Sequence, residues 1–398
     1  MTHFVELLSV GTLLIIALPA VLCCAYLGIV TLLSWRPVTP RSSTRSLCFD
    51  VIVPAHDEAP VIARCIASVR KLDWPADRFR VTVVADNCTD STHAAARAAG
   101  ARVLQRHDST RRGKGYALQL AFQVACCERW ADAVAVVDAD SEVSRNLLEA
   151  FASRIESGAH AIQAHYGVLN PFVSWRTCLM AIAQAAFHVV RSRARERLHV
   201  SCGIRGNGWC VTRELLQRVP YGAFSLAEDV EYGLDLGLAG YRVHYCDEAD
   251  VLGEMVSSAE TAKWQRQRWE GGRMILLRSR MSRLLRAGLR YRNRVCIDLA
   301  FDLLVPPLSR IALLVTALTL GASIEFWWNR HFVALLWLAL ACKGTLLLYV
   351  LRGWQLSATG ACGLTALVHA PAFVVWKLIV MARQHAPREW IRTERERP

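Results

Sequence analysis

The sequence contains no CxxC pair, and its 14 cysteines lack the spacing of a metal site. Two pairs are adjacent in the chain, Cys23 with Cys24 and Cys126 with Cys127, and neighbouring cysteines do not bridge easily. We therefore expect reduced thiols, either cytosolic or buried in a membrane, rather than a disulfide framework.

Lysine and arginine are absent before Phe4, where a long apolar run begins. The run reaches Leu33 with Glu6 as its one acidic residue, so it exceeds the roughly 20 residues that a membrane-spanning helix needs. A cleaved signal peptide is the alternative, but it would begin with a basic segment and have a shorter apolar core. We predict a transmembrane helix within residues 1–35.

Charges flanking the apolar segments predict the topology. Arg36, Arg41 and Arg45 follow the first run and place it with its N-terminus outside and its other end in the cytosol. Three more apolar stretches, about 303–324, 332–351 and 361–382, lie within residues 300–385 and precede a basic tail, residues 386–398. Three full spans would send that tail outside, against the positive-inside rule. Either one stretch lies in the interface or re-enters, or the tail breaks the rule.

The net charge is +13, from 47 basic and 34 acidic residues. Nucleic acid is one partner that such a charge suggests, but the arginines gather beside apolar segments and within residues 191–197 and 266–294. These positions suit anionic lipid headgroups of a bilayer and a diphosphate substrate better, so we expect no nucleic acid. A solvated basic face is the alternative for part of this charge.

From Phe49 to about Asp250, within an expected catalytic domain of residues 49–280, the sequence alternates short β-rich runs with helical periods, which is typical of a doubly wound α/β sheet. The pattern predicts strands at Phe49–Pro54, Arg80–Ala85, Ala101–Gln105 and Ala133–Val137, with helices at Pro60–Leu72 and Ser91–Ala99. Functional groups in such sheets collect at the carboxyl ends of the strands.

Carboxylates follow three of these predicted strands. Asp57 and Glu58 follow the first, Asp86 the second, and Asp138 and Asp140 the fourth. An acid at one strand end is common, because aspartate caps helices and occupies turns. Asp138 and Asp140, one residue apart after a buried strand, suit shared coordination of Mg²⁺ or Mn²⁺.

Six segments of the middle form an ordered set: FDVIVPAHDE, VVADNCTDST, RRGKGYAL, AVVDADS, SLAEDVEYGLDLGLAGYRV and QRQRW. In order and approximate spacing the set resembles the membrane-bound family-two glycosyltransferases, relatives of cellulose, chitin and hyaluronan synthases. The sequence looks most similar to bacterial exopolysaccharide transferases, over about Phe49 to Arg280. The resemblance implies a GT-A nucleotide-sugar transferase fold, a doubly wound mixed sheet flanked by transmembrane helices.

The resemblance implies roles at the nucleotide for three residues. Asp86 matches the aspartate that binds the base or ribose, and Lys114 matches a basic residue at the nucleotide. Glu58 matches an acid of the first-strand loop, although His56 and Asp57 stand where many members have a Tyr-Asn or similar pair.

Two further motifs concern the diphosphate. Asp138 and Asp140 match the metal motif, in which the second carboxylate contacts the cation that bridges the two phosphates. Gln265, Arg268 and Trp269 match the QxxRW motif, which lies on a helix beside the membrane and contacts diphosphate and acceptor.

Glu228 and Asp229 match the catalytic acid pair, and Asp229 falls where the general base sits. The family usually has threonine where Ala227 stands. Inversion by single displacement needs such a base on the acceptor hydroxyl. The alternative is that both acids complement the dipole at a helix N-terminus.

A loop of small residues, 201–209, matches the segment that lines the acceptor site in the family. Gly203, Asn207 and Trp209 are the acceptor-site candidates, with Trp209 as a platform for a sugar. Turn geometry alone is the alternative explanation for the glycines.

Together these features predict an inverting, metal-dependent transferase in the inner membrane, multi-pass, with its catalytic domain in the cytosol. Its donor would be a nucleotide sugar, by family default a UDP-sugar, and its acceptor a polysaccharide or lipid-linked glycan of exopolysaccharide or cell-envelope biosynthesis, with envelope polysaccharide assembly proteins as partners. A glycolipid transferase acting on a ceramide or hopanoid-type alcohol is one alternative, and a non-catalytic scaffold is another.

Overall fold

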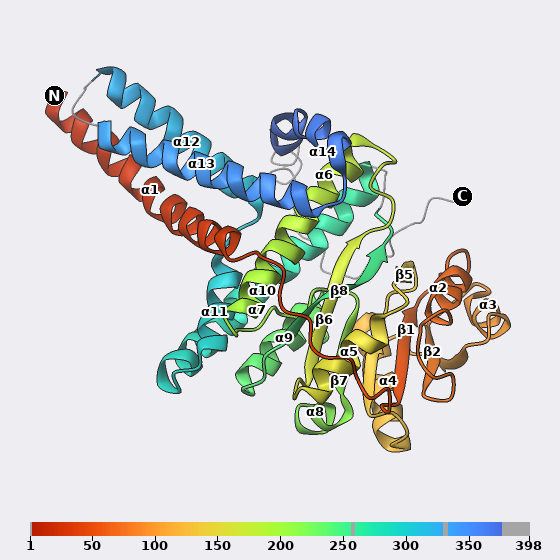
Figure 1. Cartoon of the computed structure of the whole chain (residues 1–398). Helices are drawn as coiled ribbons and strands as arrows, with labels where there is room; N and C mark the ends of the chain where they lie inside the picture. Colours follow the sequence, from red (N-terminus) through yellow and green to blue (C-terminus); the bar gives the residue numbers. More distant parts are fainter. Residues whose placement is uncertain (1, 256–258, 329–332, 376–398) are drawn as a thin grey trace.

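An eight-stranded mixed sheet lies at the centre of the middle region (Figure 1). The computed structural model describes residues 2–255, 259–328 and 333–375. The strand order is β3-β2-β1-β4-β7-β6-β8-β5. The strands are β1 (Phe49–Ala55), β2 (Phe79–Asp86), β3 (Arg102–Arg106), β4 (Ala133–Val136), β5 (Ser141–Val143), β6 (Ala161–Val168), β7 (Trp209–Thr212) and β8 (His244–Gly253).

The first half of the sheet is parallel, with β1 between β2 and β4 and with β3 beside β2. Helices α2 (Ile62–Val69), α3 (Thr92–Ala98) and α4 (Lys114–Glu128) follow its strands. The predicted strands and helices are confirmed within a few residues at each end. Because β1, β2 and β4 are parallel, their carboxyl ends meet at one edge of the sheet.

The second half gives the sheet its mixed character. Strand β7 runs antiparallel to both β4 and β6, and β5 runs antiparallel to β8, whereas β6 and β8 are parallel. The prediction of a doubly wound mixed sheet is thereby confirmed.

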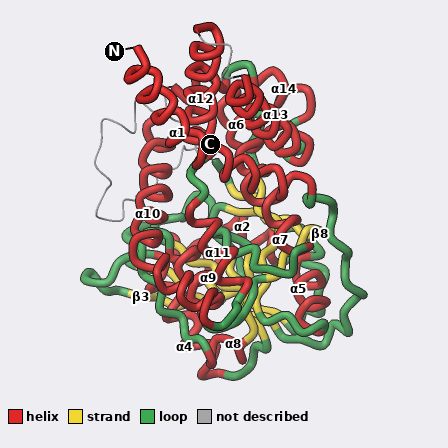
Figure 2. The backbone as a smooth tube through the Cα atoms, turned by 90° about the vertical axis from the view of Figure 1, so that its left-hand side faces the viewer, coloured by secondary structure: helices red, strands yellow, loops and turns green. Residues whose placement is uncertain are grey.

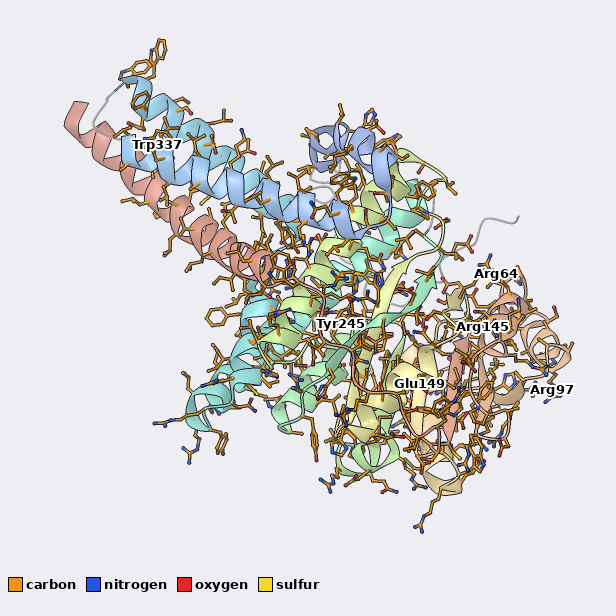
Figure 3. All side chains as sticks on the ribbon, in the orientation of Figure 1. Arg64, Arg97, Arg145, Glu149, Tyr245 and Trp337 are labelled. Carbon is orange, nitrogen blue, oxygen red and sulfur yellow. The ribbon has the colours of Figure 1, made fainter. Side chains whose placement is uncertain are left out.

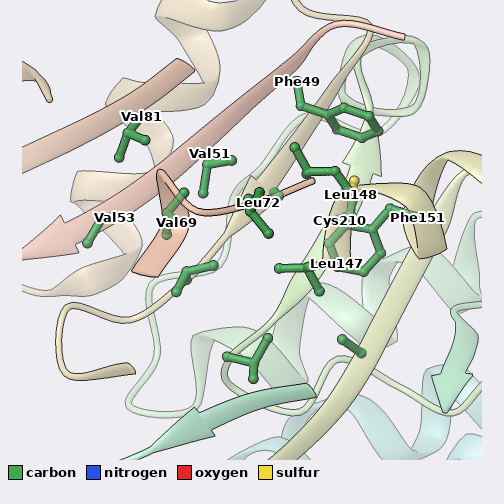
Figure 4. Packing of buried hydrophobic residues seen from close by; sticks show 14 of the residues in the cluster. Phe49, Val51, Val53, Val69, Leu72, Val81, Leu147, Leu148, Phe151 and Cys210 are labelled. Carbon is green, nitrogen blue, oxygen red and sulfur yellow. The ribbon is translucent and has the colours of Figure 1, made fainter. Parts of the chain in front are cut away.

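Alternate residues of the central strands enter cores on opposite faces of the sheet, as the two-residue period of a strand requires. Val51 and Val53 of β1 pack with α2 and α5 (Leu147–Glu156) in the core that Figure 4 shows. Ile52 packs on the other face with α4, α8 (Arg213–Arg218) and α9 (Glu228–Leu238). Both faces of β1 are thus covered, which explains its nearly continuous apolar sequence.

Three helices of the described chain are long and apolar enough to cross a membrane: α1 (Thr2–Leu32, span 13–32), α12 (Leu308–Trp328) and α13 (Val333–Leu356). They pack on one another through a shared apolar cluster. Figure 3 shows Trp337 on α13 far from Arg64 and Arg97 of the sheet region. Apolar and charged surfaces are therefore segregated along the molecule.

The last apolar stretch behaves differently from the other two after the sheet. Its described part includes α14 (Gly360–Leu367), an eight-residue helix that packs on α6 (Trp175–Gln184). Eight residues rise only about 12 Å, so α14 alone is too short to span a bilayer, and residues 376–382 of the predicted stretch lie outside the described residues. The predicted basic tail, residues 386–398, lies outside the described residues.

A layer of long helices connects the sheet to the apolar bundle. Helix α6 continues through a π-helical turn, η1 (Ala185–Val190), into α7 (Arg191–Arg197). Helix α10 (Ala259–Arg290) and α11 (Arg294–Leu304) lead to α12. Figure 2 shows the strands toward one end of the molecule, with α1, α12, α13 and α14 toward the other.

All 14 cysteines lie among the described residues, and all are free thiols. Most of them are buried, so they behave as small apolar side chains in these cores.

Candidate functional site

A cavity of about 940 Å³ begins at the carboxyl ends of β1, β2 and β4 and extends to the apolar helices. Its first part is lined by Glu58, Asp86 and Asp138, and its far part by Leu346 and Val350 of α13. One continuous space therefore joins the edge of the sheet to helices long and apolar enough for a membrane.

The β1 and β2 ends supply the first acids of the cavity. Asp86 is 5% exposed, and its carboxylate accepts a hydrogen bond from Arg106 Nη1 at 2.7 Å. The Glu58 backbone N–H donates to Thr92 Oγ1 at 2.8 Å, which fixes the loop after β1. Arg106 has no place in the sequence prediction, because it lies on the edge strand β3 rather than at a motif.

Asp138 and Asp140 both line the cavity just beyond the end of β4. Lys114 begins α4 and places its Nζ 2.6 Å from Asp138 Oδ1 and 3.9 Å from Glu228 Oε1. The same ammonium group donates to the Gly206 carbonyl at 2.9 Å. Two carboxylates at one strand end offer the hard oxygen ligands that Mg²⁺ or Mn²⁺ takes in proteins.

Asn207 holds the turn that carries these two acids. Its Oδ1 accepts the backbone N–H of Asp138 at 2.9 Å, and its Nδ2 donates to Ser141 Oγ at 2.6 Å. Its own carbonyl accepts from Gln163 Nε2 at 2.6 Å. Asn207 is fully buried, so it positions the acidic turn from behind.

Glu228 and Asp229 open helix α9 and line the cavity beside Lys114. Burial raises the pKa of Glu228 to about 7, and Asp229 adds to the shift, while Lys114 opposes it. Burial also raises the pKa of Asp229 above its usual range, against the attraction of Lys114. Raised carboxyl pKa values in a cavity are typical of groups that exchange protons.

The QxxRW residues Gln265, Arg268 and Trp269 line the same cavity from α10. Trp269 is 38% exposed. Arg268 Nε is buried and has no hydrogen-bond partner among the described residues. A buried donor without a partner is costly, so this N–H group is a candidate for a hydrogen bond to a ligand.

The acceptor-site candidates separate into two groups. Gly203 lines the cavity, whereas Asn207 and Trp209 are not among its described lining residues. Trp209 is 1% exposed in β7 and packs against Phe122 and Tyr232 in the core. A buried side chain presents no face for a sugar, so the structure assigns Trp209 to the core and Asn207 to positioning.

A cluster of arginines lines the middle of the cavity, and the sequence did not predict that these residues meet. Arg191 of α7, Arg205 of the β6–β7 connection and Arg273 of α10 surround Phe187 and Asp302. Their dispersion over three segments explains why no motif linked them, although Arg205 lies in the loop 201–209 that the resemblance assigns to the acceptor site. The basic run at residues 191–197 was the available signal.

A second group of metal-type side chains, Asp57, Cys88 and Asp90, has ligand atoms within 4.8 Å of one another. Asp57 already accepts hydrogen bonds from the Thr89 backbone N–H and hydroxyl and from the Asp90 backbone N–H. This group therefore stabilises the loop after β2.

The sequence profile described as Glycosyltransferase like family 2 matches residues 47–272, more than half of the 398 residues. The chain is 29% identical over 233 residues to the beta-monoglucosyldiacylglycerol synthase of Synechocystis sp., which covers 56% of this chain and 47% of that protein. It is 23% identical over 261 residues to the probable glycosyltransferase YdaM of Bacillus subtilis, which covers 63% of this chain and 60% of that protein. The chain spans about half the length of these curated relatives.

Among solved structures, the mannosyltransferase PcManGT from Pyrobaculum calidifontis, in complex with GDP-Man and Mn²⁺, is similar with a TM-score of 0.49 and 20% identity. The alignment covers 83% of this chain and 99% of that chain.

Proposed function

We propose that this chain, which belongs to the Glycosyltransferase like family 2, transfers a sugar from a nucleoside diphosphate to a hydroxyl group of a membrane lipid. The observation that carries the proposal is the single cavity that joins the acidic edge of the GT-A-type mixed sheet to the apolar helices. A sugar donor would occupy its acidic end, and the acceptor lipid would enter from the other.

The far end of the cavity suits hydrocarbon. Leu179 and Ile182 of α6 line it from one side, Leu346 and Val350 of α13 from another, and Phe373 lines it beyond α14. Apolar lining with few polar groups favours an acyl chain over a glycan, which would need hydrogen-bond partners. The Synechocystis relative is named as a synthase of a glucosyl diacylglycerol, a glycolipid, which supports this choice. An exopolysaccharide acceptor with assembly partners stays a prediction from the sequence.

At the donor end, Glu58 and Asp86 would bind the nucleoside, a UDP group by family default. Asp138 and Asp140 would hold Mg²⁺ or Mn²⁺, which when bound offsets the charge of the diphosphate. Arg268, with its unpartnered Nε, would donate to the same phosphates.

Asp229 would act as the general base. The lipid hydroxyl gives its proton to the Asp229 carboxylate as its oxygen bonds to the anomeric carbon of the sugar. The bond from that carbon to the phosphate oxygen breaks, and the diphosphate leaves with the electron pair. Attack from the face opposite the leaving group inverts the anomeric centre.

The same arrangement implies a topology. Arg352 near the end of α13 donates to Ser34 just after α1, at 2.9 Å, so both helices end beside the sheet region. With α1, α12 and α13 as spans, the described chain returns to that side before α14. We place this side in the cytosol of an inner-membrane protein, where nucleotide sugars are made. A reporter fused within residues 42–46 should therefore be cytosolic; an external location would contradict the proposal.

The proposal is tested by incubating membranes that contain the full chain with labelled nucleotide sugars and extracting the product. We expect a product that partitions into organic solvent and is of lipid size. Leu346→Trp should block the apolar end and lower lipid transfer while nucleotide binding persists. Its matched control is Leu347→Trp, because Leu347 is 58% exposed and points away from the cavity lining. A water-soluble polymer as the product, unaffected by Leu346→Trp, would contradict a lipid acceptor.

A further inference from the structure

We infer that Arg191, Arg205 and Arg273 form an anion site within the cavity, and that it binds a phosphate group carried by the acceptor lipid. The inference rests on the proposed function, since it specifies which class of lipid enters. A neutral lipid such as diacylglycerol would leave this site without a ligand.

Three separate segments bring these guanidinium groups around one aromatic ring. Their Cζ atoms lie 4.9 Å (Arg191), 4.5 Å (Arg205) and 6.0 Å (Arg273) from the centroid of Phe187. Phe187 lies in the π-helical turn η1, a local distortion that is frequent at functional sites. The ring face favours the cations, but it cannot replace an anion.

The charges around this ring are unequal. Asp302 lies 3.3 Å from Arg191, 3.3 Å from Arg195 and 3.5 Å from Arg205. The other acid of α11, Asp298, pairs with Arg195 at 2.6 Å. Four arginines, counting Arg273, thus face two carboxylates.

Two further described acids on these helices do not correct this excess, because Glu196 of α7 pairs with Arg242 at 2.8 Å. Glu270 of α10 lies 3.5 Å from Arg310 of α12, which is a further cation. Burial, followed by repulsion from Arg191 and Arg205, lowers the pKa of Arg273 to about 10, although Asp302 opposes the shift. A buried surplus of positive charge is unfavourable unless an anion enters.

Arg205 supplies a second, independent observation. It is 7% exposed and lines the cavity, and its Nη2 is buried without a hydrogen-bond partner among the described residues. Its Nε donates to the Cys202 carbonyl at 2.8 Å, which fixes the direction of the guanidinium plane. A fixed guanidinium group with a free N–H is the geometry that binds a phosphate oxygen.

The position of the site between base and membrane indicates which molecule carries the phosphate. Arg205 is followed by Gly206, where a Cβ atom would lie only 3.5 Å from Asp229 Oδ2. On the other side, Arg191 Nε donates to Tyr349 Oη of α13 at 3.1 Å. A lipid whose phosphate is bound here would have its headgroup hydroxyl at Asp229 and its acyl chains toward α13.

The test uses the full-length protein in detergent with a labelled donor and two acceptors of equal chain length. Dioctanoylglycerol offers a hydroxyl alone, whereas dioctanoylphosphatidylglycerol offers hydroxyls beside a phosphodiester. We expect kcat/KM to be at least about tenfold higher for the phosphate-bearing lipid, because charge-assisted hydrogen bonds are strong. Arg205→Gln and Arg273→Gln should remove that preference while the KM for the donor stays unchanged.

Two further variants separate folding from binding. Arg205→Lys keeps the positive charge but loses the paired N–H donors of the guanidinium group, so it should retain part of the preference for the phosphate-bearing lipid. Arg193→Gln is the matched control, since Arg193 lies on α7 and pairs with Asp247 at 2.6 Å outside the cavity lining. It should leave the preference intact.

Equal use of both lipids by the wild type would overturn the inference. A raised donor KM with equal losses for both lipids in Arg205→Gln would also overturn it, by assigning the arginines to the donor diphosphate. If no lipid is glycosylated, the proposed function fails. The anion site is then tested alone by comparing the affinity of the protein for dihexanoyl phosphatidate with its affinity for dihexanoylglycerol. Tighter binding of the phosphatidate that Arg205→Gln abolishes supports the site, and equal binding rejects it.

Discussion

The sheet end and the middle of the cavity differ in charge. Asp86, Asp138 and Asp229 line the sheet end beside Lys114 and Arg268, whereas Arg191 and Arg205 line the middle around Asp302. An acid-rich region binds a diphosphate with the help of a cation, while an arginine-rich region binds an anion directly. The difference supports the proposal that donor and acceptor are recognised by separate chemistry within one space.

The largest expected effect comes from removing the cation at the acidic end. Asp140→Asn should lower transfer more than about 10³-fold, because a metal ion contributes several kcal/mol to the transition state and 1.36 kcal/mol is a factor of ten. Rates measured with Mg²⁺, Mn²⁺ or excess chelator check it. Full wild-type activity in excess chelator would contradict the prediction that the acidic end needs a metal ion to bind the diphosphate.

Asp229→Asn comes next and tests the proposed general base at the sheet end. Asparagine keeps the shape but cannot take the proton, so turnover should fall about 10²- to 10⁴-fold while donor affinity changes little. Nucleotide affinity and transfer rate are measured side by side. If Asp229 only stabilises the start of α9, asparagine caps nearly as well and the rate should survive.

A smaller effect is expected for Asn207→Ala, which acts on the acidic end through the backbone. The Asp138 N–H loses its acceptor, so metal affinity should fall about 10- to 100-fold, as for other residues that orient ligands. Titrating activity with Mn²⁺ measures this, and high Mn²⁺ should restore the rate. A lower melting temperature with unchanged Mn²⁺ dependence would make Asn207 a purely structural residue.

Three acids of the acidic end could be predicted from the sequence, because each of them follows a strand whose apolar run is evident in the sequence. Asp86, Asp138 and Asp140 needed only the rule that parallel strands end at one edge. The loop before β7 had no such period, so Trp209 could not be distinguished as a core residue of an antiparallel strand.

The arginine cluster in the middle of the cavity could not be predicted as one site for a different reason. Arg191, Arg205 and Arg273 come from a helix, a loop and a second helix, and no spacing along the chain links them. The same holds for the return of α14 onto α6, since apolar composition alone does not tell a packed helix from a span.

The last prediction concerns the stability of the metal-free protein and the charge balance of the acidic end. Glu228 has a folded-state pKa of about 7 against an ordinary 4.5, so the folded chain holds a proton there that the unfolded chain has lost between these values. The contribution of this group to the free energy of unfolding is therefore complete below about pH 4.5 and is lost as the pH rises through about 7.

Glu228→Gln imitates the protonated form, so its free energy of unfolding should exceed that of the wild type by about 1 to 3 kcal/mol at pH 8 and be nearly equal to it at pH 5. Denaturant unfolding at both pH values measures the difference, with Glu214→Gln on the exposed end of α8 as the control. An unchanged pH dependence in Glu228→Gln would mean that Lys114 fully compensates the buried carboxylate, and that the acidic end is electrostatically balanced before any cation binds.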